Sequence, residues 1–128
     1  MEKPKLVGRS ILIVDCDLFD AIVLQDTFCQ EGARVMTAYS SERALQHAER
    51  SSLSAAMIDL SIGHEVVGSL CRRLRERKVP FVFYGNRIPS ELGEWVDVQI
   101  TKPAAYNKAL EVVANLLGAS SAQSGRFS

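Results

Sequence analysis

Side chains that could carry out phosphoryl chemistry stand at three places in the chain. Asp15 and Asp17 enclose a cysteine directly after an apolar run, and Asp59 ends a second apolar run. Lys102 stands after a third run and is followed by a proline. A carboxylate pair can hold a hard divalent cation, and a carboxylate beside that cation can attack a phosphoryl group as a nucleophile. A lysine could then neutralise the phosphoryl charge, so these residue types predict a phosphoryl-accepting site if the fold brings them together.

The apolar pattern predicts the strands that would position these residues. Five strand-length runs, separated by segments long enough for crossover helices, indicate a parallel sheet with helices on both faces. The first, third and fourth runs are unbroken, as in central strands, whereas the second and fifth alternate polar with apolar residues, as in edge strands. We therefore predict an α/β, flavodoxin-like (βα)5 doubly wound sheet with the strand order 2-1-3-4-5. The predicted strands span residues 10–14, 34–38, 55–58, 81–84 and 96–100.

This topology brings the candidate residues to one edge of the sheet. In an open parallel sheet, ligands bind beyond the carboxyl ends of the strands, where the strand order reverses. Here the reversal lies between the first and third predicted strands, which end at Asp15 and Asp59, and the fifth ends near Lys102. We therefore expect these three side chains to converge.

Helical spacing of apolar residues predicts the connecting helices. The first should end near Gly32, a natural stop, and bury Leu18, Ala21, Ile22 and Phe28. The third carries an apolar stripe formed by Val67, Leu70, Cys71 and Leu74. Only residues 86–95, with Pro89 and Gly93, remain for the fourth helix, which is therefore predicted to be shortened.

Length and composition limit the classes of protein to which the chain can belong. With 128 residues and 47% hydrophobic residues, it suits one domain, which we place at 10–117 after an N-terminal lead-in of 1–9. Residues 118–128 lack an apolar period and are predicted to be a disordered tail. Fifteen basic residues balance fifteen acidic ones, so neither nucleic acid nor an anionic membrane is an expected partner. No apolar segment approaches the roughly 20 residues that span a bilayer, and a cytoplasmic location is expected.

The cysteines do not predict a disulfide framework or a structural zinc site. They are odd in number and lack Cys-x-x-Cys spacing. We expect Cys29 and Cys71 to be core residues, and Cys16 to be a small, partly buried one.

Three motifs resemble the response regulator receiver family, the CheY-like superfamily, between about Ser10 and Leu117. They are Ile11-Leu12-Ile13-Val14-Asp15, Ala56-Met57-Ile58-Asp59-Leu60 and Ile100-Thr101-Lys102-Pro103. The chain looks like an atypical stand-alone member of this two-component signalling family. The resemblance implies that Asp59 accepts a phosphoryl group from a histidine kinase or a histidine phosphotransfer protein and that the signal passes on by contact with a downstream protein. It implies no enzyme activity beyond self-dephosphorylation, and it leaves a homodimer open.

The resemblance also implies a Mg²⁺ site. Asp15, Asp59 and the backbone carbonyl of Ser61 would be its ligands, and Lys102 would contact the phosphoryl group. The family normally has a second acid where this chain has Cys16. Because a thiolate is a soft ligand and Mg²⁺ prefers oxygen, this change should weaken Mg²⁺ binding. Asp17 is the neighbouring acid that could compensate, although strand-end geometry disfavours it.

Two switch positions also depart from the family pattern. The hydroxyl residue expected after the fourth strand aligns with Gly85, and the expected aromatic residue aligns with Gln99. The usual relay from hydroxyl to aromatic residue therefore cannot operate. The hydroxyl of Tyr84 could replace the missing one or block the pocket.

Two functions therefore compete. One is a phosphoryl-accepting receiver, and the other is a degenerate receiver that binds its partner without phosphorylation, as the changes at Cys16, Gly85 and Gln99 favour. An enzyme or flavin protein of the same fold is disfavoured, because the acidic residues after the first strand would repel a bound phosphate.

Overall fold

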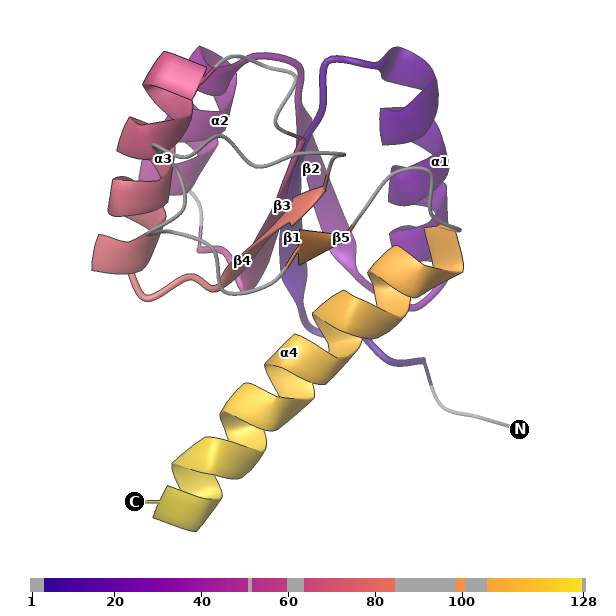
Figure 1. Cartoon of the computed structure of the whole chain (residues 1–128). Coiled ribbons are helices and arrows are strands. Elements are labelled where there is room, and N and C mark those ends of the chain that lie inside the picture. The colour runs from indigo at the N-terminus through magenta and orange to yellow at the C-terminus, as the bar shows by residue number, and fades with distance from the viewer. Residues whose placement is uncertain (1–3, 51, 60–63, 85–98, 101–105, 128) are drawn as a thin grey trace.

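The computed structural model describes residues 4–50, 52–59, 64–84, 99–100 and 106–127 (Figure 1). Strands and helices alternate along the chain, as the apolar pattern predicts. The elements are β1 (Ser10–Val14), α1 (Leu18–Cys29), β2 (Arg34–Ala38), α2 (Ser41–Arg50), β3 (Ala55–Asp59), α3 (His64–Glu76), β4 (Phe81–Tyr84), β5 (Gln99–Ile100) and α4 (Tyr106–Phe127).

The sheet has the predicted topology. Its order is β2-β1-β3-β4-β5, and each neighbouring pair is parallel. β1, β2 and β4 have the predicted bounds, and β3 includes Asp59 as one further residue. Figure 1 shows α2 and α3 on one face of the sheet and α1 and α4 on the other. The flavodoxin-like prediction is therefore confirmed.

Parts of the predicted fold lie outside the described residues. These are the shortened fourth helix at 86–95 and the first three residues of the fifth predicted strand, 96–98. At the C-terminal end α4 continues to Phe127, and the disordered tail expected at residues 118–128 stays a prediction. Alanine, serine and glutamine are compatible with a helix even without an apolar period. Figure 1 shows this end of α4 extending beyond the sheet, and the domain limits of 10–117 stay a prediction.

The core forms two layers because side chains alternate between the two faces of each strand. In β1, Leu12 and Val14 belong to the layer that α2 and α3 cover. Ile11 and Ile13 belong to the layer that α1 and α4 cover. All four side chains are almost completely buried, which confirms that β1 is a central strand.

The buried face of α1 differs from the prediction. Leu18 and Ile22 are 60% and 59% exposed, whereas Ala21, Leu24 and Phe28 are buried. The run from Ala21 to Leu24 is entirely apolar, so the sequence allows two helical stripes, and only packing selects one of them. In the structure Leu24 and Phe28 enter the core layer beneath α1 and α4.

Of the three cysteine predictions only that for Cys71 is confirmed, because Cys16, expected to be partly buried, is exposed. Cys71 lies in the buried stripe of α3 with Val67, Leu70 and Leu74, as predicted. Burial raises the pKa of its thiol to about 12, although the nearby Arg75 acts in the opposite direction. Cys29, the last residue of α1, is also exposed, contrary to the prediction of a core position, while the preceding Phe28 occupies the buried stripe of the helix.

Gly32 closes the turn between α1 and β2. Its φ of +89° lies in the left-handed region, where side chains with a Cβ are strained. A Cβ on Gly32 would also stand 2.7 Å from Cγ2 of Val7 and 3.2 Å from its Cα. The turn therefore requires glycine, both for its conformation and for its close approach to the N-terminal segment.

Every helix in the described part of the chain is too short or too polar to cross a membrane.

Candidate functional site

Two buried aspartates stand at the carboxyl ends of neighbouring strands. Asp59 is the last residue of β3, and Asp15 directly follows β1. Val14 pairs with Ile58, so the next residue along each strand brings Asp15 and Asp59 side by side. Their exposed fractions are only 1% and 3%. The predicted convergence of these two residues is therefore present in the structure.

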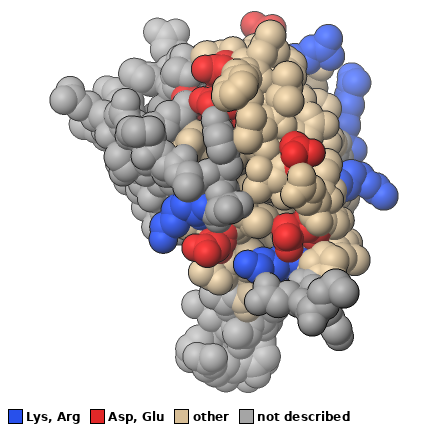
Figure 2. Space-filling view, turned by 90° about the vertical axis from the view of Figure 1, so that its right-hand side faces the viewer, with Lys and Arg blue, Asp and Glu red and all other residues tan. Residues whose placement is uncertain are grey.

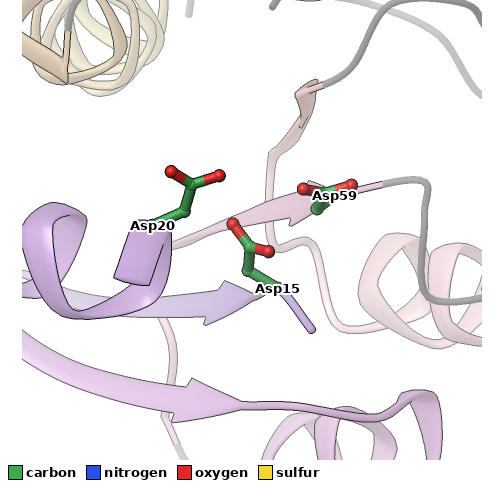
Figure 3. A group of neighbouring side chains, drawn as sticks. All are labelled: Asp15, Asp20 and Asp59. Atoms are coloured by element: carbon green, nitrogen blue, oxygen red, sulfur yellow. The ribbon is translucent and has the colours of Figure 1, made fainter. Parts of the chain in front are cut away.

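A third carboxylate joins them from a helix. Asp20, in the first turn of α1, has a carboxylate oxygen within 4.8 Å of oxygens of both Asp15 and Asp59. Figure 3 shows the three side chains directed toward a common space. Asp20 is half-buried, and it was not among the residues predicted for the site. We call Asp15, Asp20 and Asp59 the acidic cluster.

The phase of α1 explains how Asp20 reaches the cluster. Asp20 lies one turn before Leu24, on the same side of the helix, and Leu24 is completely buried against the sheet. An outward phase, with Leu18 and Ile22 buried instead, would turn Asp20 away from the strand ends. The sequence prediction placed Leu18 and Ile22 on the buried face of α1, and the same error in the phase of the helix hid the contribution of Asp20 to the site.

Asp17 caps a helix in the structure, whereas the sequence suggested it as a metal ligand that could compensate for Cys16. Its carboxylate caps α1 by accepting hydrogen bonds from the backbone N–H groups of Phe19 at 2.9 Å and Asp20 at 3.2 Å. Its own backbone N–H donates to Oδ1 of Asp15 at 2.9 Å. The carboxylate of Asp17 therefore satisfies the free end of the helix, and it is not a member of the acidic cluster.

Cys16 is exposed, and its sulfur is not among the clustered ligand atoms of the described residues. The cluster offers only carboxylate oxygens, which are the ligands that Mg²⁺ and Mn²⁺ prefer. Mg²⁺ usually keeps several of its waters, so a cluster of this size suits a mixture of direct and water-mediated contacts. On the chemistry of its donors, the cluster fits a hard divalent cation.

Several predicted site residues cannot be compared with the structure. Ser61, Gly85 and Lys102 lie outside the described residues. Gln99 is in β5, where it pairs with Phe83.

Tyr84 is the last residue of β4 and stands opposite Asp59 in the sheet register. It is only 4% exposed and belongs to the core layer beneath α1 and α4. The aromatic side chain is therefore part of the packing next to the acidic cluster. That the Tyr84 hydroxyl replaces the hydroxyl missing at Gly85, or blocks the pocket, stays a prediction.

Three exposed apolar side chains stand close in sequence to Asp20 of the acidic cluster. Leu18, Phe19 and Ile22, all at the start of α1, are 60%, 70% and 59% exposed. Figure 2 views the molecule from the α1 side and shows a largely uncharged surface with scattered acidic residues and with lysines and arginines toward its margin. The first turn of α1 thus presents apolar side chains outward and Asp20 inward.

No protein-family model matches the chain, and no curated protein matches its sequence. Solved structures do match its fold. A CheY-like response regulator receiver domain from Methanospirillum hungatei superposes with a TM-score of 0.80 over 90% of this chain and 98% of its own, at 20% identity. The receiver domain of the response regulator TorR gives 0.75 over 86% and 97%, at 28% identity. The receiver domain of the sensor histidine kinase PA1611 from Pseudomonas aeruginosa, solved with a magnesium ion in its active site cleft, gives 0.74 over 88% and 99%, at 20% identity.

Proposed function

We propose that this chain, which has the fold of a CheY-like response regulator receiver domain, accepts a phosphoryl group on Asp59 and relays the signal by contact with another protein. The observation that carries the proposal is the position of Asp59, buried at the end of β3 beside two further carboxylates. A cation held by such a cluster would adjoin the attacking oxygen. The expected donor is a histidine kinase or a histidine phosphotransfer protein, acting in the cytoplasm.

The chemistry assigned to the chain is a single displacement. An oxygen of the Asp59 carboxylate attacks the phosphorus of a phosphohistidine, and an O–P bond forms as the N–P bond breaks. The electron pair of that bond returns to the imidazole nitrogen, which takes up a proton. Mg²⁺, when bound, neutralises charge on the phosphoryl oxygens. Asp15 would hold the cation, and the contributions of the Ser61 carbonyl and of Lys102 stay predictions.

A second candidate is a degenerate receiver that binds its partner without phosphorylation. The observation that favours it is Cys16, which stands where the family has a metal-binding acid and whose exposed sulfur lies outside the acidic cluster. The residues at the switch positions, Gly85 and Gln99, agree with this reading. In that case the acidic cluster would be a remnant, and the binding surface would be formed in the unmodified protein.

Intact-mass measurement after incubation with a small-molecule phosphodonor separates the two candidates. The wild type should gain one phosphoryl group in the presence of Mg²⁺ and none in its absence. Asp59→Asn should gain none, because the amide cannot act as the nucleophile. Asp26→Asn is the matched control, since Asp26 is an exposed residue of α1 whose carboxylate bonds to Gln30. If the wild type gains no phosphoryl group but Cys16→Asp does, the degenerate receiver is the correct reading.

A further inference from the structure

The acidic cluster contains one acid from outside the motifs that resemble the receiver family. We infer that Asp20 supplies the third carboxylate of a divalent-cation site and thereby compensates for the acid that Cys16 replaces. This inference deepens the proposed function, because it concerns the cation on which phosphorylation of Asp59 depends.

The N-terminal cap sets the position of Asp20. The helix begins at Leu18 because Asp17 accepts hydrogen bonds from two backbone N–H groups, one of which belongs to Asp20 itself. The backbone of Asp20 is therefore anchored at the point where the first turn meets the strand ends. Leu24, one turn later, holds the same side of α1 in the core.

The backbone N–H of the capping residue is bonded to a strand-end aspartate. An acid at the third helical position commonly reaches back to the backbone N–H of the capping residue. Here the N–H of Asp17 donates to Asp15 Oδ1 at 2.9 Å instead. The Asp20 carboxylate faces the strand ends, and one of its oxygens lies within 4.8 Å of the ligand oxygens of both strand-end aspartates (Figure 3).

The side chains of Cys16 and Asp17 do not supply the third ligand of the acidic cluster. The Cys16 sulfur is outside the cluster, and the Asp17 carboxylate is engaged by the helix end. Two members of the cluster, Asp15 and Asp59, are more than nine-tenths buried. A solved receiver domain of similar fold holds a magnesium ion in its active site cleft, which supports a cation of this kind between the strand ends. With Asp20 the chain has three hard oxygen donors for such a cation.

Direct binding of the metal tests the inference without any phosphodonor. Mg²⁺ binding is measured by calorimetry, and Mn²⁺ binding by the loss of the free-ion electron paramagnetic resonance signal. The variants are Asp20→Asn, the double variant Cys16→Asp with Asp20→Asn, and the matched control Asp26→Asn on the same helix. Circular dichroism and urea unfolding of each variant establish that it is folded.

We expect Asp20→Asn to weaken Mg²⁺ and Mn²⁺ binding at least about tenfold, since loss of an outer partner alone commonly costs that much. Asp26→Asn should bind as the wild type does. The double variant should regain most of the affinity, because it returns an acid to position 16. The inference is overturned if Asp20→Asn binds both ions as tightly as the wild type, if the wild type binds neither ion, or if the double variant regains nothing.

These results remain distinct from those that test the proposed function. If Asp20→Asn binds metal normally while Asp59 still accepts a phosphoryl group, only the role of Asp20 is wrong. If metal binding depends on Asp20 but Asp59 accepts no phosphoryl group, the cation site stands and the proposed function fails.

Discussion

The cap at the start of α1 allows a test that separates support of the helix from binding of metal. Asp17→Ala removes the acceptor of two hydrogen bonds, from the N–H groups of Phe19 and Asp20. Loss of such a cap usually costs about 1 kcal/mol, and loss of a negative charge at a helix N-terminus adds about 0.3–1 kcal/mol. Because both hydrogen bonds are exposed, we expect the free energy of unfolding to fall by about 1–2 kcal/mol.

The replacement of Asp17 by serine gives the second half of this test. Serine is a strong N-cap that carries no charge, so Asp17→Ser should recover most of the stability that Asp17→Ala loses. It should also keep the Mg²⁺ affinity of the wild type, because the Asp17 carboxylate lies outside the acidic cluster. Asp17→Ala should bind Mg²⁺ a few-fold more weakly, since the first turn that positions Asp20 frays more often.

Urea unfolding followed by circular dichroism gives the stabilities, and calorimetric titration gives the affinities for Mg²⁺. If Asp17→Ser loses metal binding as severely as Asp20→Asn does, Asp17 is a ligand and the reasoning from its hydrogen bonds is wrong. If Asp17→Ala unfolds at the same urea concentration as the wild type, with the same slope, the cap contributes nothing to the fold.

Two further predictions concern the supporting structure. Burial raises the pKa of the Cys71 thiol from 9.0 to about 12, so the unfolded chain loses this proton first, and the free energy of unfolding should fall between pH 9 and 12 by up to about 1.4 kcal/mol per pH unit. Urea unfolding between pH 9 and 12 should show a smaller fall in the unfolding free energy of Cys71→Ala than of the wild type. If the unfolding free energy of both proteins falls equally with pH, the raised pKa of Cys71 is contradicted. Gly32→Ala should lower the unfolding free energy by at least about 1 kcal/mol because it combines a strained φ with a clash against Val7. Gly8→Ala is the matched control, with a φ of +79° but no atom within 4 Å of the added Cβ, so thermal melting of both variants should show the larger loss at Gly32.

The sheet could be predicted from the sequence because burial on both faces leaves unbroken apolar runs in its central strands. The one residue missed in β3 was Asp59, a polar side chain that joins the strand through its pairing with Tyr84. Hydropathy cannot reveal such a residue, since strand pairing involves the backbone alone.

The candidate site could be predicted where it depends on strand ends and could not where it depends on the phase of a helix. Asp15 and Asp59 follow apolar runs, so topology alone brings them together. Asp20 depends on which stripe of α1 packs on the sheet, and the apolar residues from Ala21 to Leu24 leave that choice open. The three-residue spacing from Asp17 to Asp20, typical of a capped helix start, was the clue available in the sequence.

The origin of the three carboxylates has a mechanical consequence. Asp15 and Asp59 sit on neighbouring strands whose spacing is held by backbone hydrogen bonds, whereas the separation of Asp20 from them depends on how α1 rests on the sheet. A cation shared by all three would therefore link the first turn of α1 to the ends of β1 and β3. Leu24 and Phe28 of α1 pack in the same core layer as buried residues of α4, so any shift of α1 caused by the cation would be passed to the C-terminal helix.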